Sequence, residues 1–330
     1  VATRLKTFAS PADMAASGLL DAAVVASRTE HHAADTLEFA RCGLPIFVEK
    51  PIANTVAEAA ALVEVLGDRA SRVQVAFQRQ YDEPSRVARR WLEEGRLGSL
   101  LQTHHVLQDK NPTPVGYQSC GITADMAIHL VYEAMSVRRF ELPSQVQALR
   151  FLARPYDDRA GEGANIVHVF CQWPDTSIAH LWGSRINATG YDNGFTLIGT
   201  DGRIDVGEFA GDFGSIAVRR FEGVGRDEMP RGRLVESLEF PMTRPSAGHP
   251  DFYPRFALAF EAELRAFVEA VETGRPVTPG LDVGWKTLLV ANVAEESSRQ
   301  HGRHFELQID GRPIVTAADA ARWAAANGVA

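Results

Sequence analysis

Asp125 and His129 lie four residues apart in the segment ITADMAIHLVYEA, which covers residues 122–134. In a helix, two residues at this spacing share one face and lie one turn apart. A carboxylate beside an imidazole can orient the ring and raise its basicity, as a general base requires. The same spacing is common in surface pairs, so these two residues alone do not separate a catalytic pair from a surface pair.

Lys50 is a candidate third member of such a site. The segment GLPIFVEKPIANT, residues 43–55, is an apolar strand that runs into Glu49, Lys50 and Pro51. Proline has no N–H for a strand ladder, so the strand ends there. Open α/β sheets bind ligands at the carboxyl ends of their strands, where Lys50 would lie. The alternative for an isolated lysine is a solvated loop residue.

The elements that must position Lys50 alternate between strand and helix patterns. A capping box at Thr55 and Glu58 marks one helix start, and Ser10 marks another. Connections this short predict right-handed parallel crossovers in a doubly wound sheet. The expected strands are residues 3–10, 21–27, 45–49 and 72–77, and the expected helices are residues 11–18, 31–43 and 55–67.

The second part of the chain has a different hydrophobic pattern. Long runs of alternating apolar and polar residues are separated by Gly/Asp-rich turns. Such runs predict a large, mostly antiparallel open sheet. The expected strands cover residues 100–108, 145–155, 165–173, 176–187, 194–206, 214–223 and 234–240. The expected helices are residues 84–98, 122–137, 254–274, 280–302 and 316–328.

Composition excludes several classes of partner. The 330 residues carry a net charge of −8 without a basic block, which argues against nucleic acid or an anionic membrane surface. No run reaches the ~18 apolar residues of a membrane span, and no signal-peptide pattern opens the chain. Cys42, Cys120 and Cys171 match no disulfide or zinc spacing, so we expect free thiols, no metal site and a cytoplasmic location.

Four segments in order resemble the Gfo/Idh/MocA family of oxidoreductases, which includes inositol dehydrogenases and glucose–fructose oxidoreductase. Residues 24–59 contain the E-K-P motif, and VQVAFQRQYD (residues 73–82) is similar to the family's Q-V-G-F-x-R-R-Y-D. SCGITADMAIH (residues 119–129) is similar to G-G-x-x-x-D-x-x-I-H. Residues 255–279 resemble the family's late helix and G-x-P turn. The resemblance covers nearly the whole chain.

The resemblance implies a Rossmann-type domain over residues 1–83 that binds NAD or NADP, and a substrate-binding and oligomerisation α/β domain over residues 84–330. It also implies hydride transfer between a nicotinamide and a secondary alcohol of a sugar, polyol or cyclitol. His129 would be the base, Asp125 would hold it or a neighbouring hydroxyl, and Lys50 would stabilise the oxygen. The expected cofactor contacts are Ser27, Arg28, His32, Glu49, Lys50, Pro51 and Gln78, and the expected substrate contacts are Arg79, Asn111, Asp125 and His129.

Several residues depart from the family pattern. Cys120 replaces the first of two glycines, Ala76 replaces the glycine of Q-V-G-F, Gln80 replaces the second arginine, and Tyr132 stands where the family often has aspartate. Because of these differences, the resemblance does not identify the substrate. The glycine-rich fingerprint G-x-G-x-x-G is absent from these 330 residues. The resemblance places it upstream of Val1, so we expect this stretch alone to bind NAD(H) or NADP(H) weakly.

The sequence is compatible with alternative functions. A non-catalytic sugar or nucleotide sensor could keep the fold, and an aldehyde reductase or an eliminating enzyme could keep the cofactor. The strands over residues 165–173 and 176–184 carry apolar groups on both faces, which predicts a homodimer or homotetramer built on the sheet. The sequence does not choose between NAD and NADP or identify the sugar.

Overall fold

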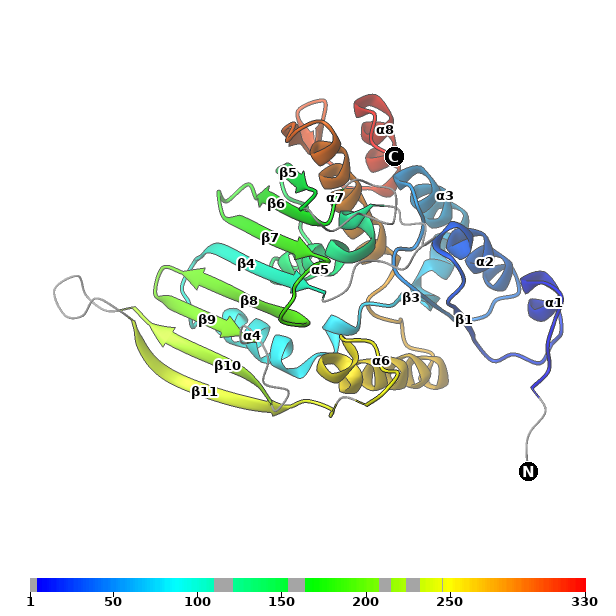
Figure 1. The fold of residues 1–330 in the computed structure, drawn as a ribbon. Coiled ribbons are helices and arrows are strands. Elements are labelled where there is room, and N and C mark those ends of the chain that lie inside the picture. The colour runs from blue at the N-terminus through cyan, green and yellow to red at the C-terminus, as the bar shows by residue number, and fades with distance from the viewer. Residues whose placement is uncertain (1–4, 110–120, 154–163, 208–214, 224–231, 245) are drawn as a thin grey trace.

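The computed structural model describes all residues except 1–4, 110–120, 154–163, 208–214, 224–231 and 245. Its first sheet has three parallel strands in the order β1-β2-β3 (Figure 1). The strands are β1 (Ala23–Val25), β2 (Ile46–Val48) and β3 (Val73–Val75). The helices α2 (Thr29–Arg41) and α3 (Val56–Leu66) connect them, followed by the 3-10 turn η1 (Gly67–Arg72). The predicted parallel sheet is confirmed.

The local signals at the helix starts behave as expected. The Thr55 side chain accepts a hydrogen bond from the Glu58 N–H, and the Glu58 carboxylate accepts one from the Thr55 N–H, which closes the capping box of α3. Ser10 caps α1 (Pro11–Ala15) by accepting from the Asp13 N–H. The amino ends of α1 and α3 could be predicted from the sequence, because a helix cap uses only residues close in sequence.

The strand expected over residues 3–10 is wrong. Residues 5–8 have no regular structure, and the chain reaches α1 through a bend at residues 9 and 10. Leu5 is 89% exposed, and Lys6 lies over the Phe8 ring at 5.4 Å. Alternation stabilises a strand only when one of its faces is buried. Here the alternating residues contribute nothing to the core.

The second sheet has nine strands in the order β11-β10-β9-β8-β4-β7-β6-β5-β12. Its neighbours are antiparallel except for β4 and β7, which run parallel. The prediction of a mostly antiparallel sheet is confirmed. The strands are β4 (Leu100–Gln108), β5 (Gln145–Phe151), β6 (Ile166–Gln172), β7 (Ile178–Ser184), β8 (Asp192–Gly199), β9 (Gly202–Val206), β10 (Ser215–Glu222), β11 (Arg233–Pro241) and β12 (Phe305–Glu306).

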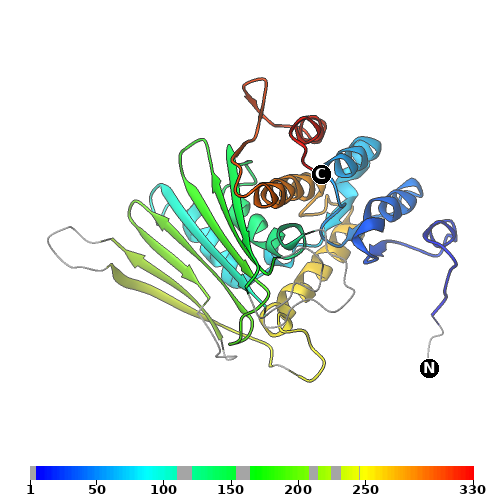
Figure 2. The same cartoon turned by 45° about the horizontal axis from the view of Figure 1, so that its top comes forward.

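Helices cover one face of this sheet, as Figure 2 shows. The helix α4 (Glu83–Glu93) packs on β9 and β10, α5 (Ile128–Ser136) packs on β4 and β7, and α7 (Leu281–Arg299) packs on β5. Strand alternation agrees with this layering. On β4, His105 is 1% exposed and faces the helices, whereas its neighbour His104 is half-buried on the other face.

The C-terminal elements return to the first sheet. The helix α7 contacts β3 and α3, and α8 (Ala317–Asn327) lies beside α3 (Figure 1). The helix α6 (Tyr253–Thr273) contacts the 3-10 turn η2 (Gln78–Gln80). One hydrophobic core therefore includes Val48 and Val75 of the first sheet and Val167 and Leu181 of the second. We propose the domain boundary near residue 83, where α4 begins.

A short hairpin of β13 (Gln308–Ile309) and β14 (Arg312–Pro313) precedes α8. Within the described ranges, no helix is both long and apolar enough to cross a membrane, and no group of three or more His, Cys, Asp or Glu residues could hold a metal ion.

Candidate active site at the junction of the two sheets

Lys50 lies in a turn directly after β2, where the carboxyl end of a parallel strand leaves the sheet. The peptide bond between Lys50 and Pro51 is cis. Beneath this turn, the two ring nitrogens of His32 lie 2.7 Å from the Pro51 carbonyl oxygen and 2.9 Å from the Ser27 carbonyl oxygen. His32 therefore connects the loop after β1 to the turn that presents Lys50.

Asp125 lies in a π-helical turn, η3 (Thr123–Ala127), which continues into α5. Such wide turns are rare and are frequent at functional sites. Close approach to the sheet is possible because β7 has a glycine here. A Cβ atom on Gly183 would lie 3.1 Å from the Met126 methyl group and 3.5 Å from the Ala127 Cβ. The helix that carries Asp125 and His129 thus lies directly on β7.

The start of this helix is held by α7. The Glu295 carboxylate accepts a hydrogen bond of 3.0 Å from the Thr123 N–H. Gly121 has φ of +115°, and a Cβ atom there would lie 2.4 Å from the Glu295 carboxylate. Glycine is therefore required at position 121, both for its backbone conformation and for the space that Glu295 occupies. Cys120, which replaces the other glycine of the family pattern, lies outside the described residues.

Lys50 and Asp125 meet across the junction of the two sheets. The Lys50 ammonium donates a hydrogen bond of 2.8 Å to the Asp125 backbone carbonyl and lies 4.0 Å from the Asp125 Oδ1 atom. On its other side, the Asp125 Oδ2 atom lies 3.2 Å from a guanidinium nitrogen of Arg185. The Asp125 carboxylate is thus placed between two cations, one from each part of the molecule.

His129 lies one helical turn beyond Asp125 and packs edge-on against Phe77, with ring centroids 6.4 Å apart. Burial lowers the pKa of His129 well below its usual value, and the positive charges of Lys50 and Arg79 act in the same direction. The imidazole is therefore neutral near pH 7. A neutral imidazole beside an ammonium group can accept a proton while the ammonium group stabilises a developing negative charge.

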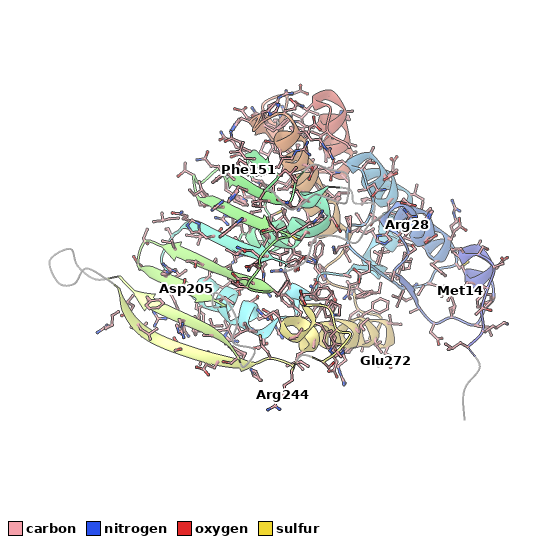
Figure 3. The ribbon with its side chains drawn as sticks, in the orientation of Figure 1. Met14, Arg28, Phe151, Asp205, Arg244 and Glu272 are labelled. Carbon is pink, nitrogen blue, oxygen red and sulfur yellow. The ribbon has the colours of Figure 1, made fainter. Side chains whose placement is uncertain are left out.

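The predicted cofactor contacts lie at the carboxyl ends of the three parallel strands. Ser27 and Arg28 follow β1, Glu49 and Pro51 follow β2, and Gln78 follows β3. Figure 3 labels Arg28 at the amino end of α2, where it pairs with Glu30 at 3.3 Å. The Ser27 hydroxyl donates to Asp35 at 2.6 Å. His32 is 2% exposed, and both of its ring nitrogens face carbonyls, so it supports the turn. Pro51 and Gln78 are buried as well.

Arg79 does not have the position expected of a substrate contact. Its side chain is 0% exposed, its guanidinium lies 2.5 Å from the Glu133 carboxylate, and it stacks on Phe256 at 5.0 Å. A fully enclosed guanidinium cannot reach a ligand directly, so Arg79 acts on the site through its charge. Asn111, the other predicted substrate contact outside the helix, lies outside the described residues.

Two groups near the site were not selected from the sequence. Arg185 directly follows β7, and the alternation of the strand places it on the same buried face as Ala179 and Leu181. A charged residue at a position where the alternation predicts a buried one could have indicated a functional role. Glu295 is 2% exposed on α7 and lies 172 residues from its partner Thr123. Local sequence carries no signal for that contact.

The fold and the site together define a two-part oxidoreductase with a Rossmann-type half. A family model described as "Oxidoreductase family, NAD-binding Rossmann fold" matches residues 1–77. A second, described as "Oxidoreductase family, C-terminal alpha/beta domain", matches residues 89–307. The chain belongs to the Gfo/Idh/MocA oxidoreductase family, as its motifs predicted, and it is an enzyme with a nicotinamide cofactor.

Several relatives cover most of the chain. Inositol 2-dehydrogenase from Rhizobium meliloti is 27% identical over 84% of this chain and 78% of its own length. Inositol 2-dehydrogenase 2 from Saccharopolyspora erythraea is 33% identical over 77% of this chain and 67% of its own length. The crystal structure of myo-inositol 2-dehydrogenase from Lactobacillus plantarum is similar with a TM-score of 0.75 and 25% identity, over 92% of this chain and 85% of that one.

Proposed function

We propose that this protein is an NAD(P)-dependent dehydrogenase that oxidises a secondary alcohol of a cyclitol, polyol or sugar, with an inositol-like cyclitol as the favoured class. The observation that carries this proposal is the contact between Lys50 and Asp125 beside a neutral His129. A non-catalytic sensor has no need for these three groups in this arrangement. The inositol dehydrogenases among the relatives support the choice of substrate class.

In this proposal, the His129 imidazole accepts the proton of the substrate hydroxyl. The Lys50 ammonium donates a hydrogen bond to the same oxygen as negative charge develops on it, and Asp125 keeps the ammonium in place through its backbone carbonyl. When bound, the nicotinamide supplies the acceptor for the hydride that leaves the carbinol carbon. The low pKa of His129 keeps its base form populated under neutral conditions.

The residues present fit the nicotinamide end of the cofactor. Three parallel strands end at one edge, and the turn after β2 is held rigidly by His32, which leaves Ser27, Glu49, Lys50, Pro51 and Gln78 to line that edge. Ligands of open α/β sheets bind at such an edge. We propose that these residues hold the nicotinamide and its ribose. The family model for an NAD-binding fold over residues 1–77 supports this placement.

We also propose a homodimer or homotetramer that associates through the open face of the nine-stranded sheet. On that face Phe170 is 44% exposed and Phe151 is 50% exposed, and Figure 3 labels Phe151 at the end of β5. The rings of Phe170 and His180 stack at 4.8 Å, and those of His168 and Trp182 stack at 5.8 Å. Apolar surface of this kind favours a protein partner. A cytoplasmic location remains our proposal from the separated cysteines, of which Cys42 and Cys171 are free thiols.

The test uses the full-length protein with NAD+ or NADP+ and three substrates, myo-inositol, scyllo-inositol and glucose. We expect reduction of the nicotinamide with at least one cyclitol, and loss of this activity in His129→Ala. A wild-type protein that binds the cyclitol without reducing the nicotinamide would favour a sensor. A wild-type protein that neither binds nor oxidises any of the three would refute the substrate class.

A further inference from the structure

Asp109 lies at the edge of the sheet where the two parallel neighbours β4 and β7 end together. Its N–H donates a hydrogen bond of 2.7 Å to the Ser184 carbonyl, and its carbonyl accepts one of 2.8 Å from the Asn187 N–H. Along β4, Asp109 has the same phase as His105 and Leu107, which face the helix side of the sheet. Arg185 has the same phase on β7. Both side chains therefore leave the sheet on the side of the active-site helix.

The Asp109 carboxylate is half-buried and has no partner among the residues that the structure describes. Within the described parts of the chain, its oxygens make no hydrogen bond or ion pair, although a desolvated carboxylate normally finds one. Burial raises the pKa of Asp109 to about 6. The charged groups around it are Asp251 and Asp125, which raise this pKa further, and Arg185 and Lys50, which lower it, and the Tyr191 phenol also lies within its electrostatic reach.

Position 132, on the helix that carries His129, holds no carboxylate in this chain. The family pattern that the chain resembles often has an aspartate there, and this chain has Tyr132. Tyr132 is 0% exposed, and its ring stacks on Phe77 with centroids 4.4 Å apart. It therefore offers no group to a polar ligand. Asp109 is an acid from a different element that faces the same side of the sheet.

We propose that Asp109 is a substrate-binding residue that accepts hydrogen bonds from a hydroxyl group, or from two vicinal hydroxyl groups, next to the carbinol that reacts. This inference rests on the proposed dehydrogenase function and adds a specificity-determining contact to it. Ionised carboxylates accept bidentate hydrogen bonds that are stronger than those between neutral groups. Binding of a polyol hydroxyl would also satisfy the half-buried carboxylate, which the described residues leave unpaired.

The test compares Asp109→Asn with the wild-type full-length protein, using NAD+ and the most active of myo-inositol, scyllo-inositol and glucose. We expect KM to rise roughly 10- to 100-fold while kcat changes by less than about 3-fold, the scale for losing a hydrogen bond to a charged group. The wild-type kcat/KM should fall as the pH drops below about 6, because Asp109 becomes protonated. The Asn variant should lack this acid limb, and Asp109→Glu should keep it.

Asp205→Asn is the matched control. Asp205 lies on β9, where it accepts from Thr196 at 2.8 Å and Arg203 at 2.7 Å, far from the trio in sequence and on another strand. It should leave KM and the pH profile unchanged. An Asp109→Asn variant that unfolds at the same denaturant concentration as wild type but keeps wild-type KM would overturn the inference and leave the dehydrogenase intact. A wild-type protein without activity on any of the three substrates would instead refute the proposed function itself.

Discussion

The Tyr132 hydroxyl donates a hydrogen bond of 2.6 Å to the Gln80 Oε1 atom. Both residues depart from the family pattern that the chain resembles, which often has aspartate at the first position and has arginine at the second. The two replacements thus meet in one contact, where a neutral pair stands in place of an acid and a base. Since Tyr132 is 0% exposed, a change at one position alone leaves the other without a suitable partner.

Tyr132→Asp should lower the free energy of unfolding by at least about 3 kcal/mol, because it buries a carboxylate and removes a packed ring. Adding Gln80→Arg should recover about 1–2 kcal/mol of that loss through a new ion pair. Urea unfolding of the two single variants and the double variant gives the coupling free energy. Strictly additive effects would show that the two positions are independent.

Removal of the Lys50 ammonium group or of the His129 imidazole should abolish most turnover. In the full-length protein, we expect Lys50→Ala and His129→Ala each to lower kcat by at least about 100-fold, the scale for a charge stabiliser or a general base. Lys286→Ala is the matched control, because Lys286 pairs with Asp282 on α7 at 2.9 Å. Near-normal turnover in both site variants would end the catalytic assignment.

Glu263 should make stability depend on pH. This α6 residue is 1% exposed, and burial, with the nearby Glu49 carboxylate, raises its pKa to about 9 from an ordinary 4.5. The folded state favours its protonated form, so its contribution is greatest below pH 4.5 and is lost as the pH rises toward about 9. At pH 7 the cost of keeping it protonated is on the order of 3 kcal/mol.

Glu263→Gln should therefore raise the free energy of unfolding at pH 7 and flatten its pH dependence between pH 5 and about 9. The Gln side chain keeps nearly the size of Glu263 and carries no charge at any of these pH values. Urea titrations at several pH values measure this effect. Glu269→Gln, an exposed change on the same helix, should alter little. An unchanged pH profile in Glu263→Gln would show that Glu263 ionises normally in the folded protein.

The open sheet face should hold the oligomer together. Light scattering at micromolar concentration should give a dimer or tetramer for the wild-type protein. Phe170→Glu should shift it toward the monomer, because a charge replaces a 44% exposed ring on the open face. An exposed apolar residue elsewhere, Val315, provides the control Val315→Glu. A wild-type monomer under these conditions would contradict the proposed interface.

Sequence patterns were sufficient where the determining contacts are local. Alternation predicted β4 to β7, β10 and β11, because burial follows the pleat. The single strand expected over residues 194–206 is instead two antiparallel strands, β8 and β9, which a bend at residues 200 and 201 separates. Alternation does not specify which strands are neighbours, so the parallel pairing of β4 with β7 was not predicted. The partners Arg79 and Glu133 lie in separate segments, and burial of that pair is visible only in three dimensions. The π-helical turn around Asp125 was not predicted from the sequence either.

The shared core makes the two halves one cooperative unit. Val48 and Val75, beside the turn of Lys50, belong to the same buried cluster as Val167 and Leu181 of the large sheet. A change that loosens one half therefore loosens the other, and heat or denaturant should unfold both in a single transition. The alignment of Lys50 with Asp125 then depends on the integrity of the whole molecule. Substitutions in that core can therefore change turnover without contacting a ligand, because they change the fraction of molecules in which Lys50 and Asp125 are aligned.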